Sequence, residues 1–252
     1  MSGIRINPQL GLLESLEVGR LINRKLIVTT NNLANVDTPG YKADGLVFRE
    51  IFIRKIGPRY KRIFKDTLPY IDFSGGVIEH TGNPLDLAII GEGFFKIQTP
   101  NGIAYTRAGN FKINSNNVVV TPQGYPVLAN GAPIIVDPGV AGLVTMEDVQ
   151  INVSHDGIIS IGNVPIGVLD IVTFDDLTKL KKIGENLFVS DGAEEIPAID
   201  YEVHQGYLEK SNVNPVKEMV KLIEIQRGFQ AVQKSIWSLG ETTGKLMEVT
   251  KR

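Results

Sequence analysis

The stretch NNLANVDTPGYKADG, residues 31–45, decides how the rest of this chain is interpreted. It ends a long segment with apolar residues at helical spacing and continues directly into Thr38, Pro39 and Gly40. A proline disfavours the helical conformation in the residue before it, so the helix ends at Thr38 at the latest. Because glycine accepts positive φ, Pro39 and Gly40 predict a tight turn that redirects the chain.

A helix is predicted for residues 8–34, directly before this turn. Asn7 is suited to cap it, and Pro8 is suited to the first helical position. Its apolar residues spread around the whole cylinder, so this helix must be buried on most of its sides. Five of them, at spacings compatible with a helix, are assigned to assembly: Leu12, Leu16, Ile22, Leu26 and Leu33.

A second helix is predicted from Asn214 to about Val249, because Asn214 followed by Pro215 is a helix start signal. Apolar residues recur here at alternating spacings of three and four, which is typical of a coiled-coil seam. The seam consists of Leu222, Ile225, Phe229, Val232, Ile236, Leu239, Thr243 and Leu246. A second apolar cluster lies on another side of the helix and consists of Val216, Met219, Val220, Ile223 and Trp237.

Between Gly75 and Gly206 short β-prone runs alternate with turn signals, which predicts an all-β domain. Two hairpins or turns are expected, at residues 100–102 (Pro-Asn-Gly) and at residues 156–157 (Asp-Gly), because both contain residues that accept positive φ.

The order of these segments predicts an α+β fold. Long N- and C-terminal α-helices form a coiled-coil-like inner domain, with an inserted all-β domain between them. The expected domains are a terminal helical polymerisation domain (residues 1–45 plus 206–252), a connector (46–74) and an all-β middle and outer domain (75–205). The connector contains a basic stretch at residues 54–65 of undetermined structure.

When an end helix packs on a single partner helix, the free energy gained by apolar burial roughly equals the entropy cost of ordering the helix. Burial of a large apolar side chain stabilises by about 1.5–3 kcal/mol, whereas ordering each residue costs about 1–2 kcal/mol in backbone entropy. The second apolar faces of both helices also need cover, and the chain has no further long helix to supply it. The patterning therefore predicts assembly with other copies or other proteins.

Composition excludes several other classes of function. The formal net charge of −2 leaves no basic excess for nucleic-acid binding, and the absence of cysteine excludes disulfides and thiolate metal sites. No apolar run is long enough for a membrane-spanning helix, and the N-terminus has no cleavable signal peptide. We expect a protein that is not embedded in a membrane.

Residues that carry chemistry are present but do not form a convincing site. The histidines at 80, 155 and 204 stand in unrelated sequence contexts without metal-ligand spacing, and GEGFFK at 91–96 lacks the third glycine of a dinucleotide loop. The acidic pairs at 175–176 and 194–195 are expected to be solvated. We expect no enzyme activity, cofactor or metal. An enzymatic or carbohydrate-binding β domain with helical appendages stays as the alternative of another class.

Three ordered blocks resemble the bacterial flagellar rod and hook family. The first is the turn region with Ala34, Asn35, Thr38, Pro39, Gly40, Tyr41 and Lys42. The second spans residues 83–111 and contains GEGFF and YTRAG. The third spans residues 205–230 and contains Ser211, Asn212, Val213 and Asn214. The basic stretch at 54–65 matches no block of this family.

This resemblance implies a structural subunit of the flagellar rod in the basal body, which spans the periplasm. It would polymerise helically through its terminal helices and form part of the hollow drive shaft that transmits torque and lets axial proteins pass. Implied partners are other copies, other rod proteins, the surrounding bushing rings and the flagellar export apparatus, which would export it without a cleaved signal peptide. The chain is more similar to the proximal than to the distal rod type, and a distal rod or hook-type protein is the alternative.

Overall fold

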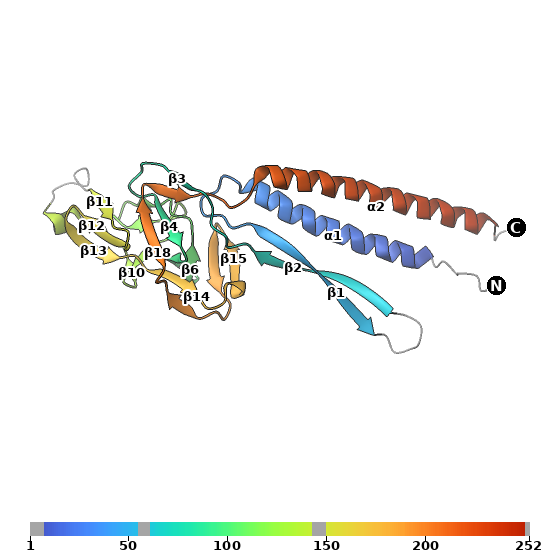
Figure 1. Ribbon diagram of the computed structural model, residues 1–252, viewed down its shortest axis with the longest axis horizontal. Coiled ribbons are helices and arrows are strands. Elements are labelled where there is room, and N and C mark those ends of the chain that lie inside the picture. The colour runs from blue at the N-terminus through green and yellow to red at the C-terminus, as the bar shows by residue number, and fades with distance from the viewer. Residues whose placement is uncertain (1–7, 55–60, 143–149, 250–252) are drawn as a thin grey trace. The chain divides into compact units, whose positions relative to one another are not determined.

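A computed structural model describes residues 8–54, 61–142 and 150–249 (Figure 1). The chain divides into two compact units. Unit 1 comprises Met1–Ala34, Asp44–Tyr70 and Asn214–Arg252, and unit 2 comprises Asn35–Ala43 and Ile71–Val213. The chain therefore passes between the units at four points, which follow residues 34, 43, 70 and 213.

Unit 1 contains the two helices, α1 (Pro8–Ala34) and α2 (Pro215–Val249), whose bounds confirm the predicted ranges. The backbone N–H of Lys217 donates to Oδ1 of Asn214 at 3.0 Å, so Asn214 caps α2 as expected. The two helices contact each other and lie side by side (Figure 1). Part of their apolar surface is therefore covered within one chain.

Unit 1 also contains a strand pair that the sequence analysis left without structure. Strands β1 (Asp44–Arg54) and β2 (Lys61–Ile71) pair with each other, and residues 55–60 between them lie outside the described part. Asn32 of α1 holds the start of β1, because its amide N–H donates to the Asp44 carbonyl (2.8 Å) and its Oδ1 accepts from the Asp44 N–H (2.9 Å). The connector therefore begins as a strand attached to the end of α1.

Unit 2 is built around a six-stranded sheet, whose described strand pairs run antiparallel. Its order is β15 (Leu180–Gly184), β16 (Leu187–Ser190), β6 (Gly102–Thr106), β5 (Phe94–Thr99), β14 (Ile171–Phe174) and β17 (Glu195–Pro197). Thr99 pairs with Gly102 at the β5–β6 hairpin, which confirms the turn predicted there.

Smaller sheets complete unit 2. A three-stranded sheet has the order β11 (Ile151–Val153), β12 (Ile158–Ile161) and β13 (Val164–Val168), and Gly157 has φ 78° in the predicted turn between β11 and β12. The paired strands are β18 (Tyr201–Gln205) with β4 (Leu87–Gly91), β19 (Tyr207–Glu209) with β3 (Ile78–His80), β10 (Ala132–Pro133) with β9 (Leu128–Ala129), and β7 (Lys112–Ile113) with β8 (Val119–Val120). The described part of unit 2 also includes the short 3-10 helices η1 (Pro138–Ala141) and η3 (Leu177–Lys179).

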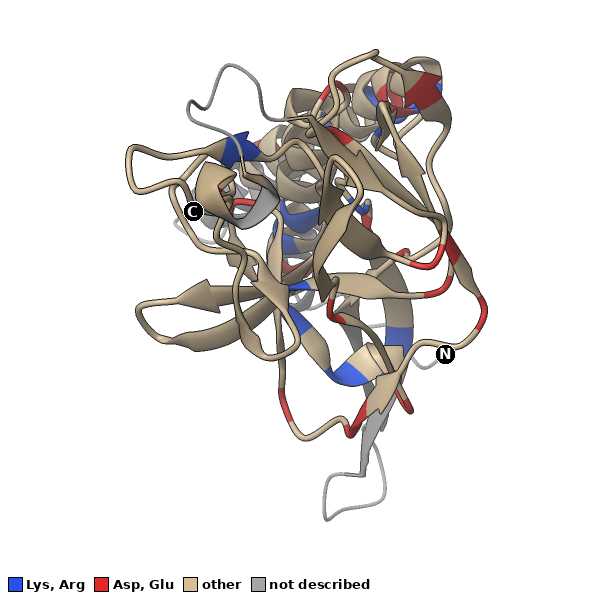
Figure 2. Ribbon diagram, turned by 90° about the vertical axis from the view of Figure 1, so that its left-hand side faces the viewer, with Lys and Arg blue, Asp and Glu red and all other residues tan. Residues whose placement is uncertain are grey.

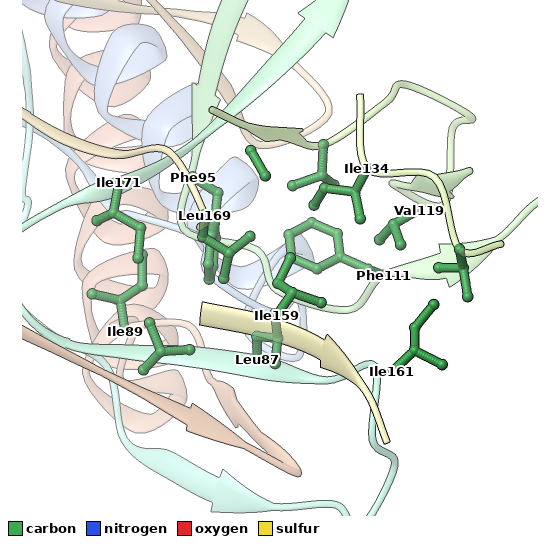
Figure 3. Packing of buried hydrophobic residues seen from close by; sticks show 14 residues of the cluster. Leu87, Ile89, Phe95, Phe111, Val119, Ile134, Ile159, Ile161, Leu169 and Ile171 are labelled. Atoms are coloured by element: carbon green, nitrogen blue, oxygen red, sulfur yellow. The ribbon is translucent and has the colours of Figure 1, made fainter. Parts of the chain in front are cut away.

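The hydrophobic core of unit 2 forms from the inward residues of these strands. In the largest cluster Phe95 and Phe111 meet edge to face with ring centroids 5.1 Å apart, and aliphatic side chains such as Ile161 and Leu169 surround them (Figure 3). A second cluster gathers Phe94, Phe188 and further aromatic and aliphatic residues. Because each buried side chain of this size contributes about 1.5–3 kcal/mol, unit 2 has a core of its own.

Lys and Arg as well as Asp and Glu occur over the described part of the ribbon (Figure 2). Within the described residues, no helix has the length and apolar character needed to cross a membrane.

Candidate functional site

The predicted turn after α1 is present and belongs to unit 2. The Thr38 N–H donates to the Asn35 carbonyl and the Tyr41 N–H donates to the Thr38 carbonyl, both at 3.3 Å. Gly40 has φ 66°, a backbone conformation that residues with a Cβ atom rarely adopt. The conformation expected from Pro39-Gly40 is therefore confirmed.

Gly40 is also the point at which the three sequence blocks meet. Its N–H donates to the Glu209 carbonyl at 2.7 Å. A Cβ atom at Gly40 would overlap the backbone of Arg107 and Ala108. Only glycine therefore lets the turn of the first block touch the second and third blocks, and we call this contact region the three-block junction: residues 38–43, 72–76, 106–109 and 209–213.

Lys42 is buried at the centre of the junction. Its ammonium group donates to Oε1 of Glu209 and to the Ser74 carbonyl, each at 2.7 Å. Both side chains of this ion pair are only 1% exposed. Oε1 of Glu209 also accepts from the Gly76 N–H at 2.8 Å. Burial lowers the pKa of Lys42, and the charge of Glu209 opposes this shift.

Arg107 of the second block completes the buried charges. Its guanidinium donates to the carbonyls of Ile89 (3.0 Å) and Gly91 (2.7 Å), and Nη1 lies 3.5 Å from Oε2 of Glu209. Burial lowers the pKa of Arg107, against the opposing charge of Glu209. One carboxylate thus lies between two cations, and backbone carbonyls compensate the remaining positive charge. Removal of Glu209 would leave two buried cations without their carboxylate, and removal of Lys42 would leave Glu209 with Arg107 as its remaining cation in this group.

Asn212 ties together the segments through which the chain leaves unit 2. Its Oδ1 accepts from the Ala43 N–H at 2.7 Å, and its Nδ2 donates to the carbonyls of Asp72 (2.8 Å) and Ser74 (3.2 Å). The Asp72 N–H in turn donates to the Ala43 carbonyl at 2.8 Å. Three of the four crossing points, those after residues 43, 70 and 213, therefore begin at one hydrogen-bonded group.

Two residues of the β15–β16 hairpin, neither of them part of a predicted motif, contact the turn. Nζ of Lys182 lies 4.2 Å from the centroid of the buried Tyr41 ring and donates to the Lys42 carbonyl. Nδ2 of Asn186 donates to the Pro39 carbonyl at 2.9 Å. No local sequence pattern marks these residues, because only the fold of the sheet brings them to the turn.

The other predicted motif residues lie at the ends of elements. Ala34 ends α1, Ser211 and Val213 are buried, and Asn214 caps α2. Oγ of Ser211 accepts from the Val213 N–H at 3.3 Å, which shapes the approach to α2.

The predicted assembly residues are covered to different degrees. Ile225 is buried, whereas Leu16, Leu26 and Phe229 are exposed. Half-buried positions are Ile22, Leu33, Leu222, Val232 and Ile236. The side chains of Leu12, Leu239 and Leu246 lie outside the described part. The second cluster on α2, namely Val216, Met219, Val220, Ile223 and Trp237, is exposed throughout.

The three histidines, expected in unrelated surroundings, lie near one another in unit 2. The rings of His155 and His204 stack with centroids 5.0 Å apart, and Tyr207 contacts both His204 and His80 edge to face. Sequence spacing missed this group because strands β3 and β18 and the β11–β12 turn bring it together. Among the described residues no group of three His, Cys, Asp or Glu side chains is placed to hold a metal ion.

Glu195, expected to be a solvated surface charge, accepts two hydrogen bonds. Nζ of Lys96 donates to Oε1 at 2.6 Å, and the Tyr105 hydroxyl donates to Oε2 at 2.7 Å. Partial burial raises the pKa of Glu195, but these hydrogen bonds and the charge of Lys96 outweigh it and leave the pKa below its usual range. The pKa of Tyr105 is raised, first by burial and then by the bond to Glu195.

The junction holds its polar groups mainly in internal bonds. Within the described residues, only Nε of Arg107 and Oε2 of Glu209 in this region are buried without a hydrogen-bond partner, and these two side chains form an ion pair with each other. These ion pairs and hydrogen bonds hold together the turn after α1 and the segments 106–109 and 209–213.

Three family profiles match parts of the chain. A profile described as "Flagella basal body rod protein" matches residues 23–42, and one described as "Flagellar hook protein FlgE/F/G D1 domain" matches residues 88–161. A third, "Flagellar basal body rod FlgEFG protein C-terminal", matches residues 204–249. Each of the three matched segments contains residues of the junction.

Curated relatives resemble the chain over most of its length. The flagellar basal-body rod protein FlgF of Caulobacter vibrioides is 36% identical over 90% of this chain and 92% of its own. Proteins named FlgG from Bacillus subtilis (33% identical, 90% of this chain and 94% of its own) and from Buchnera aphidicola subsp. Schizaphis graminum (32% identical, 88% and 92%) are similar as well.

Proposed function

The chain belongs to the family of flagellar basal-body rod proteins, and on this premise we propose that it polymerises helically through its terminal helices to form part of the hollow rod. As a member of this family it is a structural subunit of the flagellar basal body. The proposed polymer transmits torque and leaves a channel for export of axial proteins.

The observation that carries this proposal is the apolar surface of α1 and α2. On α1, Leu16 and Ile27 are exposed, and on α2 the exposed residues include Ile223 and Trp237. Apolar side chains that gather on one face of a soluble protein mark an interaction surface. Neighbouring subunits that cover these faces would supply the burial that a single chain does not provide.

We assign the parts of the chain to different tasks. Residues 1–45 plus 206–252 form the polymerisation domain, in which the terminal helices make a coiled-coil-like inner layer. Residues 46–74 are the connector, and residues 75–205 form the middle and outer β domain. Within unit 2, the buried ion pairs of the three-block junction and the Asn212 bonds hold together the segments through which these parts are covalently linked.

We further assign the chain to the proximal rod type, because its short connector and C-terminal tail resemble that type more than the distal one. Both FlgF and FlgG names occur among the relatives, so a distal rod position is the alternative. The proposed location is the periplasm-spanning rod, reached by the flagellar export apparatus without a cleaved signal peptide. Other rod proteins and the surrounding bushing rings are the proposed neighbours, and neither catalysis nor a cofactor is part of this function.

Two isoleucines on α2 provide a matched test of assembly. Ile223 is 52% exposed and Ile225 is 8% exposed. Ile223→Asp should leave the free energy of unfolding of the isolated chain within about 0.5 kcal/mol, because the change is on the surface. It should nevertheless abolish assembly, measured by sedimentation of the concentrated chain and by hook formation in cells.

Ile225→Asp is the control for an intrachain effect, because it buries a carboxylate beside α1 and should destabilise the isolated chain by several kcal/mol. Normal assembly and normal hooks in the Ile223→Asp variant would contradict the proposal that this face of α2 contacts other subunits.

A further inference from the structure

A groove of about 420 Å³ opens within unit 1 between α1, α2 and the β1–β2 strand pair. Its apolar walls include Ile22 of α1, Ile225 of α2 and the aromatic rings of Phe48 and Tyr70. Gly228 keeps the groove open on the α2 side, because its missing side chain leaves Ile22 as the nearest neighbour, 3.7 Å from an added Cβ. Sites that enclose small molecules or side chains have volumes of about 300–1,000 Å³, so the groove is large enough for one aromatic side chain.

The groove also contains an unsatisfied acceptor. Glu218 is only 6% exposed and lines the groove. Its Oε1 accepts from Lys221 at 2.6 Å, whereas its Oε2 has no hydrogen-bond partner among the described residues. Buried polar atoms are nearly always paired, so a donor that enters the groove would satisfy the Oε2 atom. The terminal torsion of a glutamate is broad, so a small rotation would present this oxygen to a donor that enters the groove.

Trp237 has the size and the hydrogen-bond donor of a side chain that would fit this groove. It is 81% exposed, the most exposed residue of the second cluster on α2, and it is the single tryptophan of the chain. Its indole is large and apolar but carries one N–H, which needs an acceptor when the ring is buried. An exposed side chain of this kind is an expected anchor at a protein interface.

The same chain cannot place Trp237 in its own groove. Trp237 follows Gly228 by nine residues (237 minus 228), which is two and a half turns at about 3.6 residues per turn. Trp237 therefore projects from the opposite side of α2, about 14 Å farther along the helix axis.

We infer that Trp237 of one subunit inserts into this groove of the next copy of the chain, with the indole N–H donating to Glu218. The inference rests on the proposed self-assembly and names one contact within it. A protruding side chain and a groove on opposite sides of one unit form a head-to-tail interface, which generates a ring or an open helical assembly rather than a twofold dimer. The open helical assembly is the one that agrees with the proposed rod.

The first experiment uses Trp237 as its own fluorescent reporter in the full-length chain. On concentration-dependent assembly, followed by sedimentation, its emission should shift to shorter wavelength and iodide quenching should be lost. Trp237→Ala should raise the concentration needed for assembly about 30-fold or more, as expected for an interface hot spot. Ile199→Ala is the matched control, because Ile199 of unit 2 is an apolar side chain that is 93% exposed and lines neither the groove nor the helix faces assigned to assembly.

The second experiment locates the groove and uses the absence of cysteine from the chain. Gln233→Cys, one turn before Trp237, is mixed with a chain carrying Glu224→Cys at the groove. Oxidation of the assembled mixture should yield the 224–233 disulfide, which requires Cα atoms about 4.4–6.8 Å apart. In the control mixture, Val47→Cys takes the place of Glu224→Cys. Val47 does not line the groove, so this mixture should give no cross-linked product. Adding Trp237→Ala to the Gln233→Cys chain should abolish the 224–233 disulfide.

The outcomes separate the two proposals. Assembly in which Trp237 stays open to iodide, or in which Val47→Cys cross-links as well as Glu224→Cys, overturns this contact and leaves the proposed rod function intact. Failure of the wild-type chain to assemble at any concentration, together with normal hooks in a strain that lacks it, overturns both.

Discussion

The ammonium group of Lys42 lies 2.7 Å from the carboxylate of Glu209, although 167 residues separate them in the chain. This ion pair joins the turn after α1 to the strand that precedes α2. The ion pair is buried, and the removal of two charges from water is costly. Its contribution to the free energy of unfolding therefore depends on its geometry and on the surrounding hydrogen bonds. Lys42 and Glu209 therefore connect the two ends of the part of the chain that forms unit 2.

Lys42→Met should strongly destabilise unit 2, because it leaves the Glu209 carboxylate buried without its main cation. We expect a loss of about 3–5 kcal/mol in the free energy of unfolding, measured by urea denaturation of the full-length chain. Glu209→Leu should cost a similar amount, because it leaves Lys42 and Arg107 buried without their carboxylate.

The double variant Lys42→Met with Glu209→Leu separates the pair from its surroundings. Its loss should be smaller than the sum of the two single losses, because neither charge of the pair remains. Strictly additive losses would show that the two groups do not interact in the way the 2.7 Å distance indicates.

Gly40→Val should destabilise the turn by more than about 1–2 kcal/mol, since φ 66° is unfavourable for a β-branched residue and the new Cβ overlaps Ala108. Because Gly40 belongs to unit 2, we expect the β domain to be destabilised as well. Gly75→Ala is the matched control, because a Cβ at Gly75 meets no atom within 4 Å. Equal stability of the two variants in thermal unfolding would contradict the assignment.

Tyr105→Phe should change the response of stability to alkaline pH. The folded protein raises the pKa of Tyr105 above the ordinary value of 10.0, so above that pH the folded state holds a proton that the unfolded state has released. The stabilisation by Tyr105 is therefore complete below about pH 10 and is lost as the pH rises.

At neutral pH the wild-type chain should be more stable than Tyr105→Phe by about 1.5–3 kcal/mol, the value of a hydrogen bond to a charged group. This difference should shrink between pH 10 and pH 11 in urea denaturation. A constant difference across that range would show that Tyr105 titrates normally in the folded protein.

The helices of the isolated chain should exchange their amide protons faster than the core strands. Their apolar faces are partly exposed, whereas β5, β6 and β14 contain the buried core of unit 2. Hydrogen exchange of the dilute chain should show fast exchange over residues 8–34 and 215–249 and protection in these strands. Uniform protection in the monomer would mean that the helices need no partner.

The sequence alone determined the features that depend on neighbouring residues. The end of α1, the positive φ of Gly40, the cap by Asn214 and the β5–β6 hairpin all follow from the conformational limits of proline, glycine and asparagine within a few positions. The helix bounds follow from an apolar periodicity that is complete within each segment.

The sequence contains signals for the strand pair β1–β2, although this pair was not predicted. Two β-prone runs flank Gly57 and Pro58, a recognised turn signal, but the basic stretch around this turn signal was left without a predicted structure. The β-prone residues of these runs favour strands, whereas their basic residues favour a solvated segment.

Only the tertiary structure decided which distant residues meet. Glu195 was expected to be solvated and the histidines to be unrelated, and nothing near Lys42 in the sequence predicted its burial. No local pattern records a contact between strands that are far apart in the chain. The burial of Lys42 beside Glu209 and Arg107 follows from strand order and from the close approach that Gly40 permits. Propensity and periodicity act over a few residues, whereas ion pairs, ring stacking and the groove beside Gly228 depend on how complete segments pack together.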